Sequence, residues 1–532
     1  MSRARIYLFD TTLRDGAQTT GIDFSIDDKR RITALLDSLG IDYIEGGYPG
    51  ANPLDTELFA KKPKLQAARF TAFGMTKRAG RSAANDPGLA ALLEADADAI
   101  TFVAKSWDYH VHVALGCTLA ENLEGIRQSI EVACSKGREA ILDCEHFFDG
   151  YKANPAYALD CAKTAYDAGA RWIVLCDTNG GTLPHEVERI VADVARHIPG
   201  ECLGIHAHND TENAVANSLA AIRAGVRHVQ GTLNGLGERC GNANLVSLIP
   251  TLLLKRDYAE VFEIGVTPAQ LAMLTKVSHT LDELLNRAPN RHQPYVGASA
   301  FATKAGIHAS AVLKDPATYE HVTPESVGNQ RRLLVSDQAG KSNIIAELER
   351  IGVILTKDDP RLSRLLEEVK DKEAQGYAYE GADASFELLA RRSLGTVPDY
   401  FAVERFRVDV ERRHNAKGEL VTVSEAIVKV RIDSTVLISA AEGNGPVNAL
   451  DLALRKDLGK YQPFIEDLEL VDFRVRVFQG GTDAVTRVLI EFRDASGEHW
   501  STVGVSANLI DASFQALTDA ITFKLLKSGA GK

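Results

Sequence analysis

Two histidines separated by a single residue, His206 and His208, are the most informative candidates for chemistry in this sequence. They lie at the end of a β-forming run. Alternate residues of a strand point to one face, so both imidazoles can reach a common site. Two neutral imidazoles and one carboxylate can hold a divalent cation and leave positions open for a substrate. Asp15, in the segment DTTLRDG, is the candidate carboxylate. Two structural histidines hydrogen-bonded to neighbouring carboxylates are the alternative.

Four other polar residues have types and positions suited to catalysis or binding. Arg14 precedes Asp15 and could stabilise a developing oxyanion, or it could form only a structural ion pair. Glu145 could be a general base or an orienting acid, or a carboxylate that holds nearby backbone. Thr178 could donate to a substrate carboxylate, although capping of the next helix is the simpler interpretation. Asn242, in the glycine-rich segment GLGERCGN, could place an amide oxygen on a hard cation.

The elements that would position these residues are eight short β-rich runs in the first 235 residues. They are Arg5–Asp10, Ile41–Gly46, Arg69–Gly74, Asp98–Ala104, Ala140–Glu145, Arg171–Asp177, Cys202–His208 and Arg227–Leu233. Helical patterns fill the intervals, such as the stripe of Ile32, Leu36 and Leu39. Strand–helix alternation repeated eight times predicts a TIM (β/α)8 barrel. A doubly wound sheet is the competitor, but the first strand runs into DTTLRDG and not into a GxGxxG loop.

A TIM barrel places its active site at the C-terminal ends of its strands. The candidate residues follow or end the first, fifth, sixth and seventh runs, at Asp15, Glu145, Thr178, His206 and His208. This shared position favours the metal interpretation of the histidine pair over the structural one.

The sequence changes character after the barrel pattern. Residues 276–395 predict mostly helices, with a charged run over 357–373 that is typical of a solvated helix face. Farther on the pattern is β-rich and repeats, because FRVDV from Phe406 resembles FRVRV from Phe473. We expect a TIM-barrel catalytic domain over 1–275, helical linker subdomains over 276–395, and a C-terminal α+β regulatory domain with an internal repeat over 396–527. The repeat interface could bind a small effector or could serve only for dimerisation.

Composition argues against several classes of protein. The 532 residues carry 60 Lys and Arg against 72 Asp and Glu, a formal net charge of −12, which disfavours nucleic acid or an anionic membrane as a partner. No apolar run approaches the ~18 residues needed to span a bilayer, and the N-terminus shows no signal-peptide core. The seven cysteines lie between Cys117 and Cys240 without a CxxC pair. A reduced, cytoplasmic setting is predicted.

Segments spread over nearly the whole chain resemble the 2-isopropylmalate, homocitrate and citramalate synthase family. In family order they are DTTLRDGAQ, CEHFFDG, CDTNGG, HAHND, LNGLGERCGNANL, AGIHASAVLKD and VTPESVG. The segments EGGYPGANPLD and EGNGPVNALDLALRKDL are most similar to members that act on pyruvate. The resemblance implies condensation of acetyl-CoA with a 2-oxo acid, here pyruvate, followed by thioester hydrolysis to (R)-citramalate and CoA. The expected effector is isoleucine, the end product.

The resemblance also assigns roles to residues. It implies a divalent metal ion (Mn, Zn or Mg) on Asp15, His206 and His208, with Asn242 near or on the metal. For the substrates it implies that Arg14 contacts the keto oxygen, Glu145 positions or activates acetyl-CoA, and Thr178 holds the pyruvate carboxylate. His308 matches a histidine that reaches the active site of the partner subunit, with Tyr319 as a less certain companion, so a homodimer is expected.

Three alternatives remain at this point. A sister synthase would use 2-oxoisovalerate or 2-oxoglutarate; Met75 and Phe102 could narrow the pocket toward pyruvate, or could equally belong to the core. A carbon–carbon lyase or a biotin-linked carboxyltransferase would share the barrel, but the chain lacks a Met-Lys-Met biotin site, and a lyase would not need the C-terminal repeat. A non-catalytic amino-acid sensor would have no need of the intact metal trio.

Overall fold

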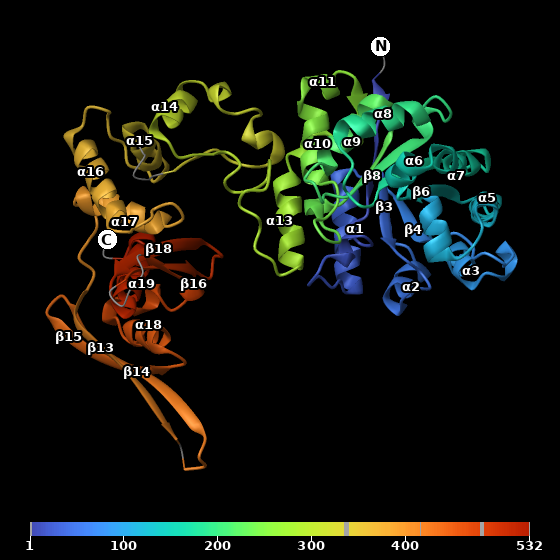
Figure 1. Ribbon diagram of the computed structural model, residues 1–532. Helices are drawn as coiled ribbons and strands as arrows, with labels where there is room; N and C mark the ends of the chain where they lie inside the picture. Colours follow the sequence, from blue (N-terminus) through green and yellow to red (C-terminus); the bar gives the residue numbers. More distant parts are fainter. Residues whose placement is uncertain (1–2, 335–339, 415, 479–483, 531–532) are drawn as a thin grey trace. The chain divides into compact units, whose positions relative to one another are not determined.

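The computed structural model describes residues 3–334, 340–414, 416–478 and 484–530, and the chain divides into two compact units. The first unit comprises Met1–Phe301 with His321–Arg331, and the second comprises Ala302–Glu320 with Arg332–Lys532. Figure 1 shows the first mainly in blue to green and the second mainly in yellow to red. Among the described residues, no helix has both the length and the apolar character that a membrane crossing requires.

Eight parallel strands form a closed barrel in the first unit, which confirms the predicted fold. They follow one another around the barrel in chain order, and the last pairs with the first. The strands are β2 (Tyr7–Asp10), β3 (Tyr43–Gly47), β4 (Arg69–Met75), β5 (Ala99–Lys105), β6 (Glu139–Glu145), β7 (Trp172–Asp177), β8 (Leu203–Ala207) and β9 (His228–Gly231).

A helical segment follows each strand. The main helices are α1 (Ile26–Leu39), α2 (Pro53–Ala60), α3 (Pro87–Glu94), α5 (Leu119–Ser135), α7 (Pro155–Asp167), α8 (Pro184–Val194), α9 (Ala214–Ala224) and α10 (Leu245–Leu254). The other α-helices of this unit are α4 (Asp108–His110), α6 (Phe147–Ala153), α11 (Arg256–Ala259), α12 (Pro268–Leu271) and α13 (Leu274–Leu284). The sequence explains the bounds of α1, because Ser25 and Asp28 form a capping box at its start and Gly40 ends it at φ 91°.

The first predicted strand is shorter in the barrel than the sequence suggested. Ala4–Arg5 forms a separate strand, β1, which pairs in parallel with β10 (Phe262–Glu263), and β2 begins only at Tyr7. The start of the predicted strand therefore pairs with a segment that follows the last barrel helix and not with a barrel strand. Local β-propensity does not reveal such a pairing.

Aromatic and polar side chains fill the inside of the barrel. Phe9, Tyr43 and Trp172 are buried there, and Trp172 Nε1 donates to the Tyr43 hydroxyl at 3.1 Å. His228 packs among the three rings, at 4.9 Å from Trp172 and 5.2 Å from Phe9 between ring centroids. This packing closes the barrel interior beneath the strand ends that carry the candidate site.

The second unit joins helices to a duplicated β-rich part. The helices are α14 (Gly306–Lys314), α15 (Lys341–Arg350), α16 (Pro360–Ala374) and α17 (Asp383–Ser393), and short strands β11 (Ala302–Thr303) and β12 (Arg332–Leu333) pair in parallel. Leu362, Leu365 and Val369 are buried along α16, so the predicted charged run covers the opposite face of an amphipathic helix.

The duplicated part confirms the internal repeat. Each half is an antiparallel three-stranded sheet followed by a helix. The first half is β13 (Ala402–His414), β14 (Leu420–Ile432), β15 (Thr435–Gly443) and α18 (Pro446–Lys456); the second is β16 (Glu469–Phe478), β17 (Val485–Arg493), β18 (His499–Ser506) and α19 (Leu509–Lys527). Residues of both halves share one hydrophobic core, in which Val428 and Val488 are fully buried.

Candidate metal centre and substrate pocket

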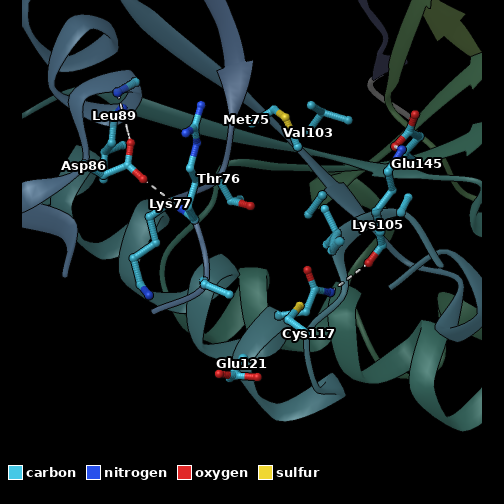
Figure 2. A pocket seen from close by; sticks show the side chains of 18 of the residues that line it. Met75, Thr76, Lys77, Asp86, Leu89, Val103, Lys105, Cys117, Glu121 and Glu145 are labelled. Atoms are coloured by element: carbon cyan, nitrogen blue, oxygen red, sulfur yellow. Dashed lines mark hydrogen bonds and ion pairs between the residues drawn. The ribbon is translucent and has the colours of Figure 1, made fainter. Parts of the chain in front are cut away.

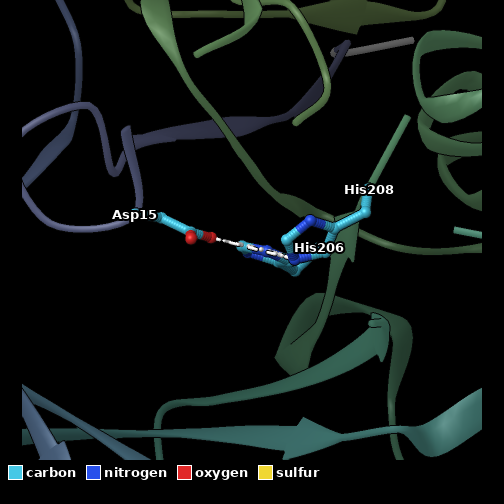
Figure 3. A group of neighbouring side chains, drawn as sticks. All are labelled: Asp15, His206 and His208. Atoms are coloured by element: carbon cyan, nitrogen blue, oxygen red, sulfur yellow. Dashed lines mark hydrogen bonds and ion pairs between the residues drawn. The ribbon is translucent and has the colours of Figure 1, made fainter. Parts of the chain in front are cut away.

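The carboxylate of Asp15 and the imidazoles of His206 and His208 meet at the C-terminal ends of the barrel strands (Figure 3). Asp15 Oδ2 lies 3.2 Å from His206 Nε2 and 3.9 Å from His208 Nε2, and the two Nε2 atoms are 3.3 Å apart. All three side chains are buried, and no other such cluster occurs in the described part of the chain. The structure thus brings together the trio that the sequence predicted.

The loop after β2 and the end of β8 hold the trio in place. The backbone N–H of Asp15 donates to the Thr11 carbonyl at 2.9 Å, within a tight turn that directs the carboxylate across the barrel mouth. His206 lies in β8 and His208 directly after it, so the alternation of strand side chains sends both imidazoles the same way.

The charges around the trio suit cation binding. Burial and the neighbouring His206 lower the pKa of His208 to about 3, so this imidazole is neutral. Burial raises the pKa of Asp15, but Arg14 and His206 outweigh it and keep the carboxyl ionised. For His206, burial lowers the pKa and the hydrogen bond to Asp15 more than restores it. A cation bound here would therefore compete with a proton on His206.

Asn242 lies beside the trio as a fourth potential ligand. A β-bridge pairs it with His208, and its Nδ2 donates to the Leu236 carbonyl at 3.1 Å. Its Oδ1 is buried and has no hydrogen-bond partner among the described residues. Gly237, at φ +154°, makes room for this amide, because a Cβ there would lie 2.2 Å from Asn242 Nδ2. An unpaired buried oxygen next to two imidazoles and a carboxylate fits a divalent cation.

Arg14 is fixed at the edge of the trio by two neighbours. Its Nε donates to Glu45 Oε2 at 2.7 Å, and its guanidinium lies 3.9 Å from the centre of the Phe73 ring. Its Nη1 is 3.6 Å from Asp15 Oδ1. Burial lowers the pKa of Arg14, but the carboxylates of Glu45 and Asp15 raise it further, so the charge is permanent. The structural ion pair considered from sequence is present, and it also orients the guanidinium.

A cavity of about 330 Å³ opens at the ends of β4, β5 and β6 (Figure 2). Figure 2 shows Glu145 with Lys105 on one side of the cavity and Asp86 with Lys77 on the other. Glu145 forms an ion pair with Lys105 and is partly exposed to the cavity. The ion-pair partner of the carboxylate is therefore a side chain, whereas the alternative considered from sequence was that it holds nearby backbone.

Met75 and Phe102, the two residues considered for pocket shape, lie in different environments in the structure. Met75 is 43% exposed and lines the cavity, whereas Phe102 is fully buried in the hydrophobic core between the barrel and its helices. Among the two, only Met75 can affect the fit of a ligand in this cavity.

Thr178 does not cap the following helix. Helix α8 begins after Leu183, while Thr178 Oγ1 accepts a hydrogen bond from the backbone N–H of His146 at 2.8 Å. The Thr178 hydroxyl hydrogen is left to donate elsewhere, and the carbonyl of the same residue accepts from Arg239 at 2.7 Å. The capping interpretation is wrong, and the hydroxyl is positioned between the ends of two neighbouring strands.

His308 and Tyr319 belong to the second unit. Their rings lie 4.4 Å apart between centroids, and both side chains are exposed. His308 is in α14, and Tyr319 follows a short 3₁₀ turn. The pair forms a small aromatic surface within its own unit.

Sequence reasoning missed several residues that complete the barrel mouth. Lys105 ends β5 and contacts Glu145, so its position at a strand end could have singled it out, whereas Glu45 lies inside β3 and contacts Arg14. Gln230 contacts both His206 and Asp143 inside the barrel, and nothing in the local sequence marks Gln230 or Asp143.

Comparison with known proteins adds three family matches. Residues 5–278 match the HMGL-like family, residues 295–376 match the homocitrate synthase post-HMGL domain-like family, and residues 380–525 match the LeuA allosteric (dimerisation) domain. The buried Asp15–His206–His208 cluster is typical of metal binding in HMGL-like proteins.

Several curated proteins are similar over almost the full length of the chain. The (R)-citramalate synthase of Geobacter sulfurreducens is 50% identical over 527 residues, which is 98% of each chain. The (R)-citramalate synthase of Aquifex aeolicus is 47% identical over 528 residues, again 98% of each. A probable 2-isopropylmalate synthase of Methanopyrus kandleri is 32% identical over 522 residues, covering 97% of this chain and 98% of its own.

Proposed function

The chain belongs to the (R)-citramalate synthase family, and we propose that it condenses acetyl-CoA with pyruvate and hydrolyses the thioester to give (R)-citramalate and CoA. The observation that carries this proposal is the buried Asp15–His206–His208 cluster with Arg14 at its edge, in a chain that is 47–50% identical to (R)-citramalate synthases over nearly its full length.

The donor set fits one divalent cation, Mn, Zn or Mg. Asp15, His206 and His208 would hold it, with the unpaired Oδ1 of Asn242 as a further ligand. Bound there, a divalent cation would supply Lewis-acid polarisation of the keto group.

The chain's own residues provide the remaining functions of the reaction. Arg14, held flat by Glu45 and Phe73, donates to the oxygen on which negative charge develops. Thr178 donates its free hydroxyl hydrogen to the pyruvate carboxylate. Glu145, paired with Lys105 at the cavity, positions the acetyl thioester and helps to activate its methyl group.

The second unit supplies subunit contacts and regulation in this proposal. Two copies associate through the part that matches the LeuA allosteric (dimerisation) domain, and isoleucine binds there as the inhibitor. His308, with the Tyr319 ring tilted against it, reaches the active site of the partner subunit, so the dimer is required for full activity.

Release of free thiol from acetyl-CoA tests the function directly. The full-length chain is assayed with pyruvate, 2-oxobutyrate, 2-oxoisovalerate and 2-oxoglutarate, each with and without isoleucine, and the product is analysed by chiral chromatography. We expect the highest kcat/KM with pyruvate, (R)-citramalate as product, and inhibition by isoleucine. Selection between 2-oxo acids by pocket volume is worth about 1–3 kcal/mol per methylene.

Two outcomes would replace the proposal. A higher kcat/KM with 2-oxoisovalerate or 2-oxoglutarate would assign the chain to a sister synthase. No thiol release with any of the four acids, together with isoleucine binding, would favour a non-catalytic sensor.

A further inference from the structure

We propose that Gln230, oriented by Asp143, is a positioning residue that keeps a hydrogen on His206 Nδ1 and so leaves Nε2 as the nitrogen that faces the metal site. The inference rests on the proposed metal site and extends it to the residues behind it. In this proposal the barrel interior orients the His206 imidazole before a metal ion binds. It does not orient the His208 imidazole in the same way.

The contacts form a chain from one barrel strand to another. Gln230 on β9 lies beside His206 on β8 in the strand register, and its Oε1 is 2.7 Å from His206 Nδ1. Its Nε2 donates to Asp143 Oδ1 on β6 at 2.9 Å. All three side chains are buried, with 0% exposure for Gln230. The two hydrogen bonds therefore cross the inside of the barrel, where water cannot replace either of them.

Asp143 determines which end of the Gln230 amide faces the histidine. A carboxyl oxygen accepts a hydrogen bond, so the NH2 group of the amide must point to Asp143 and the carbonyl oxygen to His206. In the structure Nε2 of Gln230 faces Asp143 Oδ1 and its Oε1 faces His206 Nδ1, which is the orientation that a carboxylate at 143 selects. An acceptor at 2.7 Å from Nδ1 requires a hydrogen on Nδ1, so Nε2 is the ring nitrogen that can exchange its proton for a cation.

Only an unprotonated ring nitrogen can bind a cation, so the tautomer of each histidine matters. His206 Nε2 faces Asp15 Oδ2 at 3.2 Å, on the side opposite Gln230. His208 lacks such support, because its Nδ1 is buried without a hydrogen-bond partner among the described residues. Hydrogen bonds behind a metal-binding histidine typically contribute about 10–100-fold to metal affinity.

Mn²⁺ binding to the apo form of the full chain tests the inference without measuring catalysis. Affinity is measured by competition with a fluorescent chelator, and urea unfolding of the apo form monitors the fold. Gln230→Met keeps the length of the side chain and removes the acceptor, so we expect the Kd for Mn²⁺ to rise about 10–100-fold. Thr101→Val, at a buried β5 hydroxyl with no partner among the described residues, is the matched control and should bind like the parent chain.

A double variant separates positioning from a merely structural role. In Gln230→Glu with Asp143→Asn, the new carboxylate at 230 still accepts a hydrogen bond from His206, and the new amide at 143 donates one to that carboxylate. The Kd for Mn²⁺ should therefore return to within about threefold of the parent value. A structural role would instead lower the urea midpoint of Gln230→Met and leave its Kd unchanged.

An unchanged Kd in Gln230→Met overturns the inference. If that variant does not fold, the single variant Asp143→Asn decides, because an amide at 143 lets Gln230 turn over and favour the wrong tautomer. A Kd raised about threefold or more then supports the inference, and an unchanged Kd overturns it. Failure of the parent chain to bind Mn²⁺ would instead remove the metal site on which both proposals depend.

Discussion

In the barrel unit, charged pairs such as Lys29–Asp55 and Arg14–Glu45 are buried, whereas in the duplicated part Lys460–Asp433 and Arg407–Asp409 are paired in solvent. The side chains of Lys29 and Asp55 are 5% and 8% exposed, against 53% and 66% for Lys460 and Asp433. Buried pairs fix geometry because breaking one leaves an unpaired charge in a low dielectric, while solvent weakens exposed pairs.

Apolar residues show the reverse arrangement. The barrel core is closed, but the first strand of each repeat leaves valines exposed, namely Val410 on β13 and Val475 and Val477 on β16. The barrel thus holds its polar groups by internal contacts, while the duplicated part leaves apolar surface exposed, the kind of surface that can contact another chain. The following predictions test each side of this comparison, starting with the largest effect.

Removal of a metal ligand should have the largest effect. Asp15→Asn keeps the size of the side chain and loses its charge, so we expect thiol release to fall about 10³-fold or more and Mn²⁺ binding to weaken in parallel. Asp433→Asn, at an exposed carboxylate of the duplicated part, is the matched control. Full activity after thorough treatment with a chelator would contradict the prediction.

Breaking the buried pair at the barrel should have the next largest effect. Lys29 Nζ also donates to the Gly46 carbonyl at 2.9 Å, so it ties α1 to the end of β3 that carries Glu45. Lys29→Met should lower the free energy of unfolding by about 3–5 kcal/mol, measured by urea denaturation. Lys460→Met, at the exposed pair, should leave the unfolding curve unchanged. Equal effects of the two substitutions would remove the contrast between the units.

The planar shape of Arg14 should matter as well as its charge. Arg14→Lys keeps a positive charge, but an ammonium group cannot reproduce the contact with Glu45 and the stacking on Phe73. We expect kcat to fall about 10²-fold, with the smaller change in KM for pyruvate. Arg127→Lys, in an exposed pair on α5, is the control and should have the parent kcat. A parent-like kcat in Arg14→Lys would show that charge alone is sufficient.

The exposed valines should affect association more than folding. Val475→Asp with Val477→Asp places two charges on an apolar surface, so we expect the dimer Kd to rise about tenfold or more, measured by light scattering after gel filtration over a range of concentrations. If His308 acts in the partner subunit, thiol release should fall with the fraction of dimer. A dimer of parent stability would place the subunit contact on a different surface.

Much of the barrel and of the candidate site follows from local patterns. Strand–helix alternation and the capping sequence at Ser25 are properties of neighbouring residues, and they predict the (β/α)8 barrel. His206 and His208 share a strand, and Asp15 follows another at the same end of the barrel, so their convergence could be expected once the fold was known. The repeat of FRVDV and FRVRV likewise indicates the two similar sheets.

The remaining features depend on which distant strands meet. Gln230 lies 24 residues from His206, which the register of β8 and β9 makes its neighbour, and 87 from Asp143, which it meets only across the inside of the barrel. Pairing of β5 with β6 places Lys105 beside Glu145, and packing assigns Met75 to the cavity and Phe102 to the core. Side-chain periodicity determines which face of a strand is buried, but it contains no information about the partner across the barrel. The sequence by itself therefore determined the scaffold and the candidate ligands of a cation, and tertiary packing alone decided how those ligands are held.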